Sequence, residues 1–142
     1  SIIIIDFGSS LKSVLASLVY SDVDDKTVLF TTINQWFDES IFRGNSVKNL
    51  YFPSVDLKQF KKYNEKYFNT FGLKPDEITI LAYDALGLIN YVWKKNNNVK
   101  NINDFFIKEE IRGKIGTFKF KDNKVLQKLK IYKIEKNKFK EY

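Results

Sequence analysis

Short apolar runs alternate with polar turns along the first third of the chain, and this pattern predicts a strand–helix–strand unit. Residues 1–5 form a continuous β-branched run, which is typical of a parallel strand buried on both faces. Residues 6–10 supply a turn with helix-capping side chains. The next apolar positions have helical spacing, and residues 27–31 predict a second buried strand. The helical stripe consists of Leu11, Val14, Leu15, Leu18 and Val19.

The middle of the chain predicts a short strand followed by two helices. A strand over residues 49–52 is expected to stop at Pro53. Asp56 is a suitable N-cap for a helix that Gly72 closes, and Pro75 opens the next helix. The expected inward positions are Leu57, Phe60, Tyr63, Tyr67 and Phe71 in the first helix, and Ile78, Leu81, Ala82, Ala85, Ile89 and Val92 in the second.

The last third changes its period from 3.6 to 2. A short helix is expected within residues 101–110, with burial supplied by Phe105, Phe106 and Ile111. Beyond Gly116, apolar residues alternate with lysines, as in a half-buried strand. A tight turn at Asp122–Asn123, a long strand over 125–134 and a last strand over 139–142 complete the pattern. The fold class is therefore α/β, a parallel sheet with flanking helices that ends in an antiparallel hairpin.

Composition is that of one globular domain. The chain has 142 residues, of which 44% are apolar and 16% aromatic, enough for a sizeable core. No run approaches the roughly 20 apolar residues that cross a bilayer. The chain lacks methionine, so we expect it to be a piece of a longer protein.

The residues that many reactions need are absent. The sequence contains neither cysteine nor histidine, which excludes disulfides, Cys/His zinc sites and His-based triads. The segment Gly113–Gly116 lacks the Gly-Lys-Ser/Thr ending of a phosphate loop. We therefore expect no catalytic residues, no metal and no cofactor, and a protein that is not an enzyme.

The net charge of +7 raises the question of a nucleic-acid partner. The excess lies in residues 57–142, but only Arg43 and Arg112 are arginines, and arginine is the residue that favours bidentate contacts with bases and phosphates. The abundance of Ile, Asn, Phe and Tyr indicates an AT-rich coding bias that raises lysine content. A solvated surface is the preferred interpretation, with no nucleic acid as a partner.

Candidate ligand-binding residues follow the predicted parallel strands, because ligands bind outside the carboxyl ends of such strands. Hydroxyls, amides and helix N-terminal N–H groups there suit an anionic or zwitterionic small molecule, and the aromatic rings would supply apolar walls. The alternative is that the serines only cap a helix and the aromatic residues only fill the core. The candidates are Phe7, Ser9, Thr31, Thr32, Asn34, Trp36 and Tyr83.

Several segments resemble one known family in the right order. Residues 80–86 (Ile-Leu-Ala-Tyr-Asp-Ala-Leu) resemble the "aYDA" helix of leucine/isoleucine/valine-binding-type proteins, which are type I periplasmic binding proteins. Residues 60–75 resemble the preceding helix of that family, and residues 113–123 its Gly-rich hairpin. Residues 6–11 and 29–36 are similar to the penicillin-binding-protein activator subgroup, the LpoA-like lipoproteins.

The resemblance implies the C-terminal part of one two-lobed ligand-binding domain. Residues 1–56 would be second-lobe strands, residues 57–121 mainly first-lobe helices and the hairpin, and residues 122–142 the hairpin return and a crossing strand. The missing N-terminal half of the same domain would be a partner of this chain. The location implied is periplasmic, with or without a lipid anchor outside this chain.

Two functions follow from the resemblance. The first is a small-molecule-binding domain of the ABC-transporter substrate-binding type, for an amino-acid-like ligand or a small carboxylate. Amino-acid binders of the family carry a carboxylate where this chain has Thr31–Thr32, and a hydroxyl cannot replace that charge pairing. This departure favours the second function, a periplasmic regulator of peptidoglycan synthases that acts through protein contacts.

Overall fold

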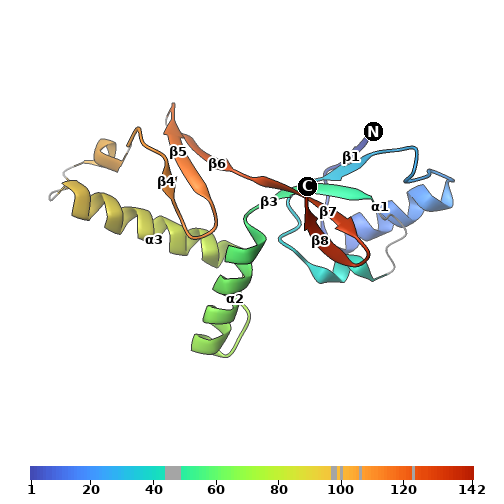
Figure 1. Ribbon diagram of the computed structural model, residues 1–142, viewed down its shortest axis with the longest axis horizontal. Helices are drawn as coiled ribbons and strands as arrows, with labels where there is room; N and C mark the ends of the chain where they lie inside the picture. The colour runs from blue at the N-terminus through green and yellow to red at the C-terminus, as the bar shows by residue number, and fades with distance from the viewer. Residues whose placement is uncertain (44–48, 97–98, 100, 106, 123) are drawn as a thin grey trace. The chain divides into compact units, whose positions relative to one another are not determined.

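The computed structural model describes residues 1–43, 49–96, 99, 101–105, 107–122 and 124–142. The chain divides into two compact units (Figure 1). We call residues Ser1–Ser54 with Lys130–Tyr142 the five-stranded unit, and residues Val55–Leu129 the three-stranded unit. Each unit is described by itself.

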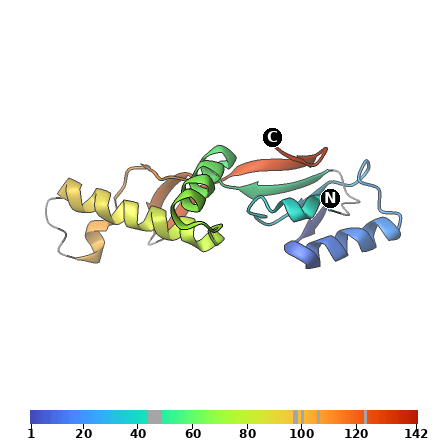
Figure 2. The ribbon, with the colours of Figure 1, turned by 90° about the horizontal axis from the view of Figure 1, so that it is seen from below.

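The five-stranded unit is a mixed sheet with a helix on one face (Figure 2). Its strand order is β1-β2-β3-β7-β8, with parallel pairing among the first three strands and antiparallel pairing among the rest. This arrangement confirms the α/β class with a parallel sheet and flanking helices. The elements are β1 (Ile2–Ile4), α1 (Gly8–Tyr20), β2 (Phe30–Thr32), the 3-10 helix η1 (Glu39–Phe42), β3 (Leu50–Ser54), β7 (Lys130–Glu135) and β8 (Lys138–Glu141).

Only one face of this sheet is buried. The pairing register places the buried strand residues on the same face, and Leu11 and Leu15 of α1 are also buried. The opposite face carries Ile3 and Ile131, which are 73% and 44% exposed. The buried strand residues are Ile4, Phe30, Thr32, Leu50, Phe52, Ser54, Tyr132 and Ile134.

An aromatic cluster forms the centre of this core. The ring of Phe37 meets those of Tyr132, Phe139 and Phe52 edge-on, at centroid distances of 4.8, 5.4 and 5.9 Å. Edge-to-face pairs at such distances contribute about 0.5–1.5 kcal/mol beyond their buried area. The loop after β2, the central strand β3 and the final hairpin are therefore joined by ring packing.

Three expectations about these strands are wrong. The run at residues 1–5 is an edge strand with one exposed face, because β1 has a neighbour on one side only. The second strand begins at Phe30 and not at Thr27, whose amide and hydroxyl both bond the Asp24 carbonyl in a turn. Pro53 does not stop β3, because parallel pairing with β2 ends at Tyr51 and leaves no ladder bond for proline to remove.

The three-stranded unit consists of two helices and a small antiparallel sheet of order β4-β5-β6. The Asp56 side chain accepts a hydrogen bond from the Gln59 amide at 2.9 Å, and Gly72 adopts a left-handed φ of 71°, so both predicted ends of α2 are confirmed. The elements are α2 (Leu57–Phe71), α3 (Glu77–Asn96), the 3-10 helix η2 (Ile102–Phe105), β4 (Ile111–Arg112), β5 (Thr117–Lys121) and β6 (Lys124–Lys128).

Burial in this unit differs from the predicted stripes. On α2 only Tyr63 is fully buried, and Phe71 is 60% exposed. On α3 the buried residues are Ile80 and Val92, whereas Ile78 is 71% exposed. The predicted strand over 125–134 is two strands, β6 and β7, which belong to different sheets. Phe106 and Asn123, to which burial and a turn were assigned, lie outside the described residues.

Candidate functional site

Hydrogen bonds join the carboxyl ends of β1 and β2. The Thr32 hydroxyl donates to the Asp6 carbonyl oxygen at 2.9 Å. The side-chain amide of Gln35 donates to the same oxygen at 2.9 Å and to the Ile33 carbonyl at 3.1 Å. Thr32 and Gln35 are 5% and 4% exposed. Both polar side chains therefore satisfy the backbone at the strand ends.

A second set of bonds connects the loop after β2 to the end of β3. The Asn34 side-chain oxygen accepts from the Ser54 hydroxyl at 2.8 Å and from the Trp36 amide at 2.9 Å. Ser54 is fully buried, where an unpaired hydroxyl would be costly. Asn34 thus fixes the loop on the strand end, and this bonding occupies its side-chain oxygen.

The start of α1 remains exposed. Phe7 precedes the helix and is 67% exposed, and Ser9 lies in the first turn, also exposed. The Asp6 carboxylate accepts bonds from the Ser10 hydroxyl and the Phe7 amide, and these two bonds lower the pKa of Asp6 below its ordinary value of 3.8. No side chain caps the helix at Phe7, so the expected capping serine is not found there.

The loop after β2 contains two consecutive left-handed aromatic residues. Trp36 and Phe37 have φ values of 47° and 59°, a region that bulky residues rarely adopt. Such conformations cost about 1–3 kcal/mol each and persist only where the surroundings fix them. Here the Asn34 bond to the Trp36 amide and the ring packing of Phe37 supply that constraint.

The structure brings some of the predicted site residues together and separates others. Thr32, Asn34 and Trp36 share the edge where the parallel strands end, next to Asp6. Thr31 points to the opposite face of the sheet from Thr32, because neighbouring strand residues alternate. Tyr83 belongs to the three-stranded unit, where its ring packs edge-on against Tyr63 at 5.7 Å.

Sequence reasoning missed Gln35, whose side-chain amide lies within hydrogen-bond distance of three acceptors at this edge. Its position within the polar segment after a buried strand was the available signal. An amide side chain at that position can donate hydrogen bonds to backbone carbonyls that have no other partner. The segment was interpreted as a source of ligand contacts, whereas most of its polar atoms hold the fold.

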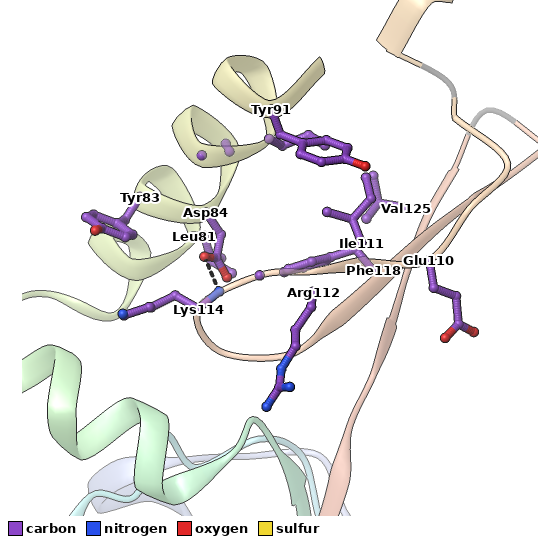
Figure 3. Close-up of a pocket in the computed structure, with 14 residues that line it drawn as sticks. Leu81, Tyr83, Asp84, Tyr91, Glu110, Ile111, Arg112, Lys114, Phe118 and Val125 are labelled. Atoms are coloured by element: carbon purple, nitrogen blue, oxygen red, sulfur yellow. Dashed lines mark hydrogen bonds between the residues drawn. The ribbon is translucent and has the colours of Figure 1, made fainter. Parts of the chain in front are cut away.

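A cavity of about 650 Å³ lies in the three-stranded unit, between α3 and the small sheet (Figure 3). Figure 3 shows Leu81 and Tyr91 of α3 on one side and Ile111, Phe118 and Val125 of the sheet on the other. The size is that of a drug-sized ligand site, and the lining is mainly apolar. The remaining lining residues are Tyr83, Asp84, Ala85, Gly87, Leu88, Glu110, Arg112, Gly113 and Lys114.

One carboxylate closes the end of this cavity. Asp84 of α3 accepts a hydrogen bond from the Lys114 amide at 2.6 Å (Figure 3), and a second from the Ile115 amide at 3.2 Å. A side chain added at Gly113 would clash with the Phe118 ring and would meet the Asp84 carboxylate at 2.7 Å. The turn at 113–116 therefore needs glycine at its first position in order to lie against the helix.

Of the cavity residues, sequence reasoning singled out Tyr83 as a ligand contact but did not predict the cavity. The signal was present: Leu81, Asp84 and Leu88 have helical spacing. The helical stripe predicts inward positions at Leu81 and Ala85, whereas Asp84 belongs only to the motif that resembles the family. The pairing of the strands decides which face of the sheet the helix contacts, and hydrophobic periodicity does not predict that pairing.

The part of the chain that the structure describes contains neither a cluster of potential metal ligands nor a helix that could cross a membrane. Within it, no group of three or more acidic side chains is placed to hold a metal ion. None of the described helices combines the length and apolarity needed to cross a membrane.

Comparison with known proteins gives a similarity of fold. No known family profile matches the sequence, and no curated protein resembles it significantly. Among solved structures, the fold is similar to that of an extracellular ligand binding receptor from Desulfohalobium retbaense DSM5692, with a TM-score of 0.69 and 12% identity. The match covers 99% of this chain and 26% of the receptor chain. The chain therefore has a periplasmic-binding-protein-like α/β fold.

Proposed function

We propose that this chain is part of a ligand-binding domain of the periplasmic receptor type, which delivers a small molecule to an ABC transporter and catalyses no reaction. The observation that carries the proposal is the fold match over 99% of the chain to an extracellular ligand binding receptor. The location proposed with it is the periplasm.

The strand-end edge of the five-stranded unit is the proposed ligand-binding region. Phe7 and Ser9 are exposed there, so they are accessible to a ligand without rearrangement. Thr32 and Asn34 act in this proposal by fixing the loop conformation, because their side chains already bond Asp6 and Ser54. A small carboxylate suits the N–H groups at the start of a helix better than a free amino acid does.

A specific observation favours the second candidate, a regulator of peptidoglycan synthases that acts through protein contacts. The family resemblance sets Thr31–Thr32 at the place of the ammonium-binding carboxylate, and the Thr32 hydroxyl is buried and bonded to the backbone. In this candidate, the strand-end edge is a structural feature and the exposed surface is the functional one.

We further propose that the remaining part of the same domain covers the bare face of the five-stranded sheet. Parallel strands are almost always covered on both faces, yet Ile3 and Ile131 are exposed. The receptor of similar fold is also much longer, since this chain matches 26% of it.

The chain has no cysteine, so the variant Ile3→Cys carries one thiol. That thiol should react rapidly in this chain and slowly in a longer polypeptide. Equal rates of thiol reaction in the two polypeptides would contradict the proposal that this face of the sheet is covered.

A thermal-shift screen tests the receptor proposal. The panel contains small carboxylates, amino acids and peptidoglycan fragments. A ligand at 100 times its dissociation constant should raise the free energy of unfolding by about 2.7 kcal/mol. No shift with any small molecule, together with retention of a synthase in a pull-down, would replace the receptor by the regulator.

Matched variants then locate the site. Phe7→Ala and Ser9→Ala should weaken binding at least tenfold without lowering stability, because both side chains are exposed. Ser17→Ala, on an exposed position of the same helix, is the control.

Ala85→Phe fills the cavity of the three-stranded unit, and Ala82→Phe is its exposed neighbour outside the lining. Loss of binding in Ala85→Phe alone would move the site to the cavity.

A further inference from the structure

The small sheet of the three-stranded unit has one apolar and one basic face. Residues that pair directly across antiparallel strands lie on the same face. Phe118 and Phe120 pair with Gln127 and Val125, and this face lines the cavity under α3. The alternate residues form the opposite face, which we call the basic face. It consists of Arg112, Thr117, Lys119, Lys121, Lys124, Leu126 and Lys128.

The basic face concentrates positive charge. It carries five cationic side chains and no carboxylate, and all five belong to exposed residues. The whole segment 110–128 has six basic and two acidic residues, a net charge of +4. Glu110 and Asp122, the two acidic residues, precede β4 and follow β5. Arg112 also borders the cavity, but Figure 3 shows its guanidinium group directed away from α3.

Three other lysines of the chain differ from these cations by pairing with glutamates. Lys95, Lys130 and Lys140 form ion pairs with glutamates at 2.6, 2.9 and 3.2 Å. Among the described residues, no ion pair involves a cation of the basic face. A row of like charges on neighbouring strands is mutually repulsive, so a partner with negative charge would stabilise it.

We propose that the basic face binds the surface of an anionic phospholipid bilayer. Neighbouring strands lie about 4.8 Å apart, so the three strands present their cations as a flat patch that matches a planar surface. Leu126 pairs with Lys119 in the middle of the patch and is 47% exposed, where its side chain can enter the headgroup region. Each lysine near such a surface contributes about 1 kcal/mol.

The composition of the patch distinguishes a bilayer from a nucleic acid. Phe118 and Phe120 lie on the opposite face, so the basic face offers no ring for base stacking. Four of its five cations are lysines, which act as hydrated point charges and not as bidentate phosphate ligands. A diffuse layer of anionic headgroups needs only such point charges.

Vesicle co-sedimentation tests the proposal. The probes are phosphatidylcholine vesicles and vesicles with two parts phosphatidylcholine to one part phosphatidylglycerol. The chain should partition onto the anionic vesicles only, and increasing salt should release it. The variant K119Q/K121Q/K124Q/K128Q should lose about two to three orders of magnitude in partitioning, from about 1 kcal/mol per lysine and 1.4 kcal/mol per tenfold.

A matched variant separates the patch from the net charge. K58Q/K61Q/K62Q/K66Q removes four exposed lysines of α2 and therefore changes the net charge equally. It should retain most of the partitioning, and far-ultraviolet circular dichroism checks that both variants are folded. Equal losses in the two variants would overturn the proposal in favour of net charge alone.

Two further arms identify the partner. Inorganic phosphate at the ionic strength of the chloride buffer should not compete better than chloride, whereas competition would indicate a phosphate site instead of a surface. Single-stranded DNA should be retained more weakly than the anionic vesicles. Tighter retention of DNA, abolished by the same four substitutions, would assign the patch to nucleic acid and overturn the proposal.

Leu126→Ser should reduce partitioning severalfold with no change in salt dependence.

Discussion

The two units differ in how they bury apolar residues. The five-stranded unit has a dense core in which Phe37, Phe52, Tyr132 and Phe139 pack ring against ring, and its strand ends are joined by side-chain hydrogen bonds. The three-stranded unit has few fully buried residues and a cavity of about 650 Å³. The five-stranded unit therefore has a packed core beneath one face of its sheet, whereas the three-stranded unit has an open cavity between its helix and its sheet.

This difference separates residues that stabilise the fold from those available for binding. In the five-stranded unit, the polar residues that first suggest a ligand site satisfy the backbone. In the three-stranded unit, apolar residues with a regular helical pattern face an open cavity or solvent, such as Leu86 at 68% exposure. At the strand-end edge, the exposed Phe7 and Ser9 therefore remain available for binding, and in the three-stranded unit the uncovered apolar positions do.

The two tryptophans allow each unit to be measured alone. Trp36 lies in the five-stranded unit and Trp93 in the three-stranded unit, and the sequence has no others. Urea unfolding followed by fluorescence reports the five-stranded unit in a Trp93→Phe background. In a Trp36→Phe background it reports the three-stranded unit. The stability predictions below are made for these backgrounds.

The largest effect is expected from Phe52→Ala. Phe52 is 1% exposed and contacts three rings, so its removal should lower the free energy of unfolding of the five-stranded unit by about 3–5 kcal/mol. Leu86→Ala, on the exposed side of α3, should change that of the three-stranded unit by no more than about 0.5 kcal/mol. Similar losses of unfolding free energy in both variants would show that Leu86 is buried. The contrast between the two units would then be wrong.

A pair of glycines tests the packing of the turn against α3. Gly113→Ala places a methyl group against the Phe118 ring and the Asp84 carboxylate, and should destabilise the three-stranded unit by about 2–3 kcal/mol. Gly87→Ala, inside α3, meets nothing within 4 Å and should stabilise the unit by up to about 1 kcal/mol, because alanine favours helix. A neutral Gly113→Ala would mean that the turn does not contact the helix as described.

A smaller effect is expected at the strand ends. Asn34→Ala leaves the buried Ser54 hydroxyl and the Trp36 amide without their acceptor, which should cost the five-stranded unit about 1–2 kcal/mol. Asn69→Ala, at an exposed position of α2, is the control and should change the stability of its own unit little. If Asn34→Ala were equally mild and also abolished ligand binding, Asn34 would be a ligand contact instead of a loop anchor.

The smallest effect concerns Asp6. Because hydrogen bonds hold its folded pKa below the ordinary value of 3.8, the contribution of Asp6 is present above pH 3.8 and is lost as the pH falls through the folded pKa. Ser10→Ala removes the larger of the two bonds and should raise the pKa of Asp6 toward 3.8, as measured by carboxyl NMR titration. Ser17→Ala should leave the titration unchanged. An unchanged pKa in Ser10→Ala would show that this bond is absent in solution.

The sequence by itself determined the elements whose signals are local. The Asp56 cap, the Gly72 end and the helix over 77–96 follow from capping chemistry and a 3.6-residue period. The alternation at Phe118 and Phe120 likewise identified a strand. These features depend on residues within about one turn of each other, so the α/β class and most of the order of elements could be derived without a structure.

Tertiary structure decided which faces are buried and which polar groups are engaged. Residues 1–5 read as a doubly buried strand, yet β1 is an edge strand, because burial depends on what packs against it. The pairing register divides the run over 125–134 between two sheets. It also places the lysines at 119 and 124 on one face of the small sheet. The pairing of β3 with β7 joins residues far apart in sequence, and neither periodicity nor composition shows which strands pair or in which register.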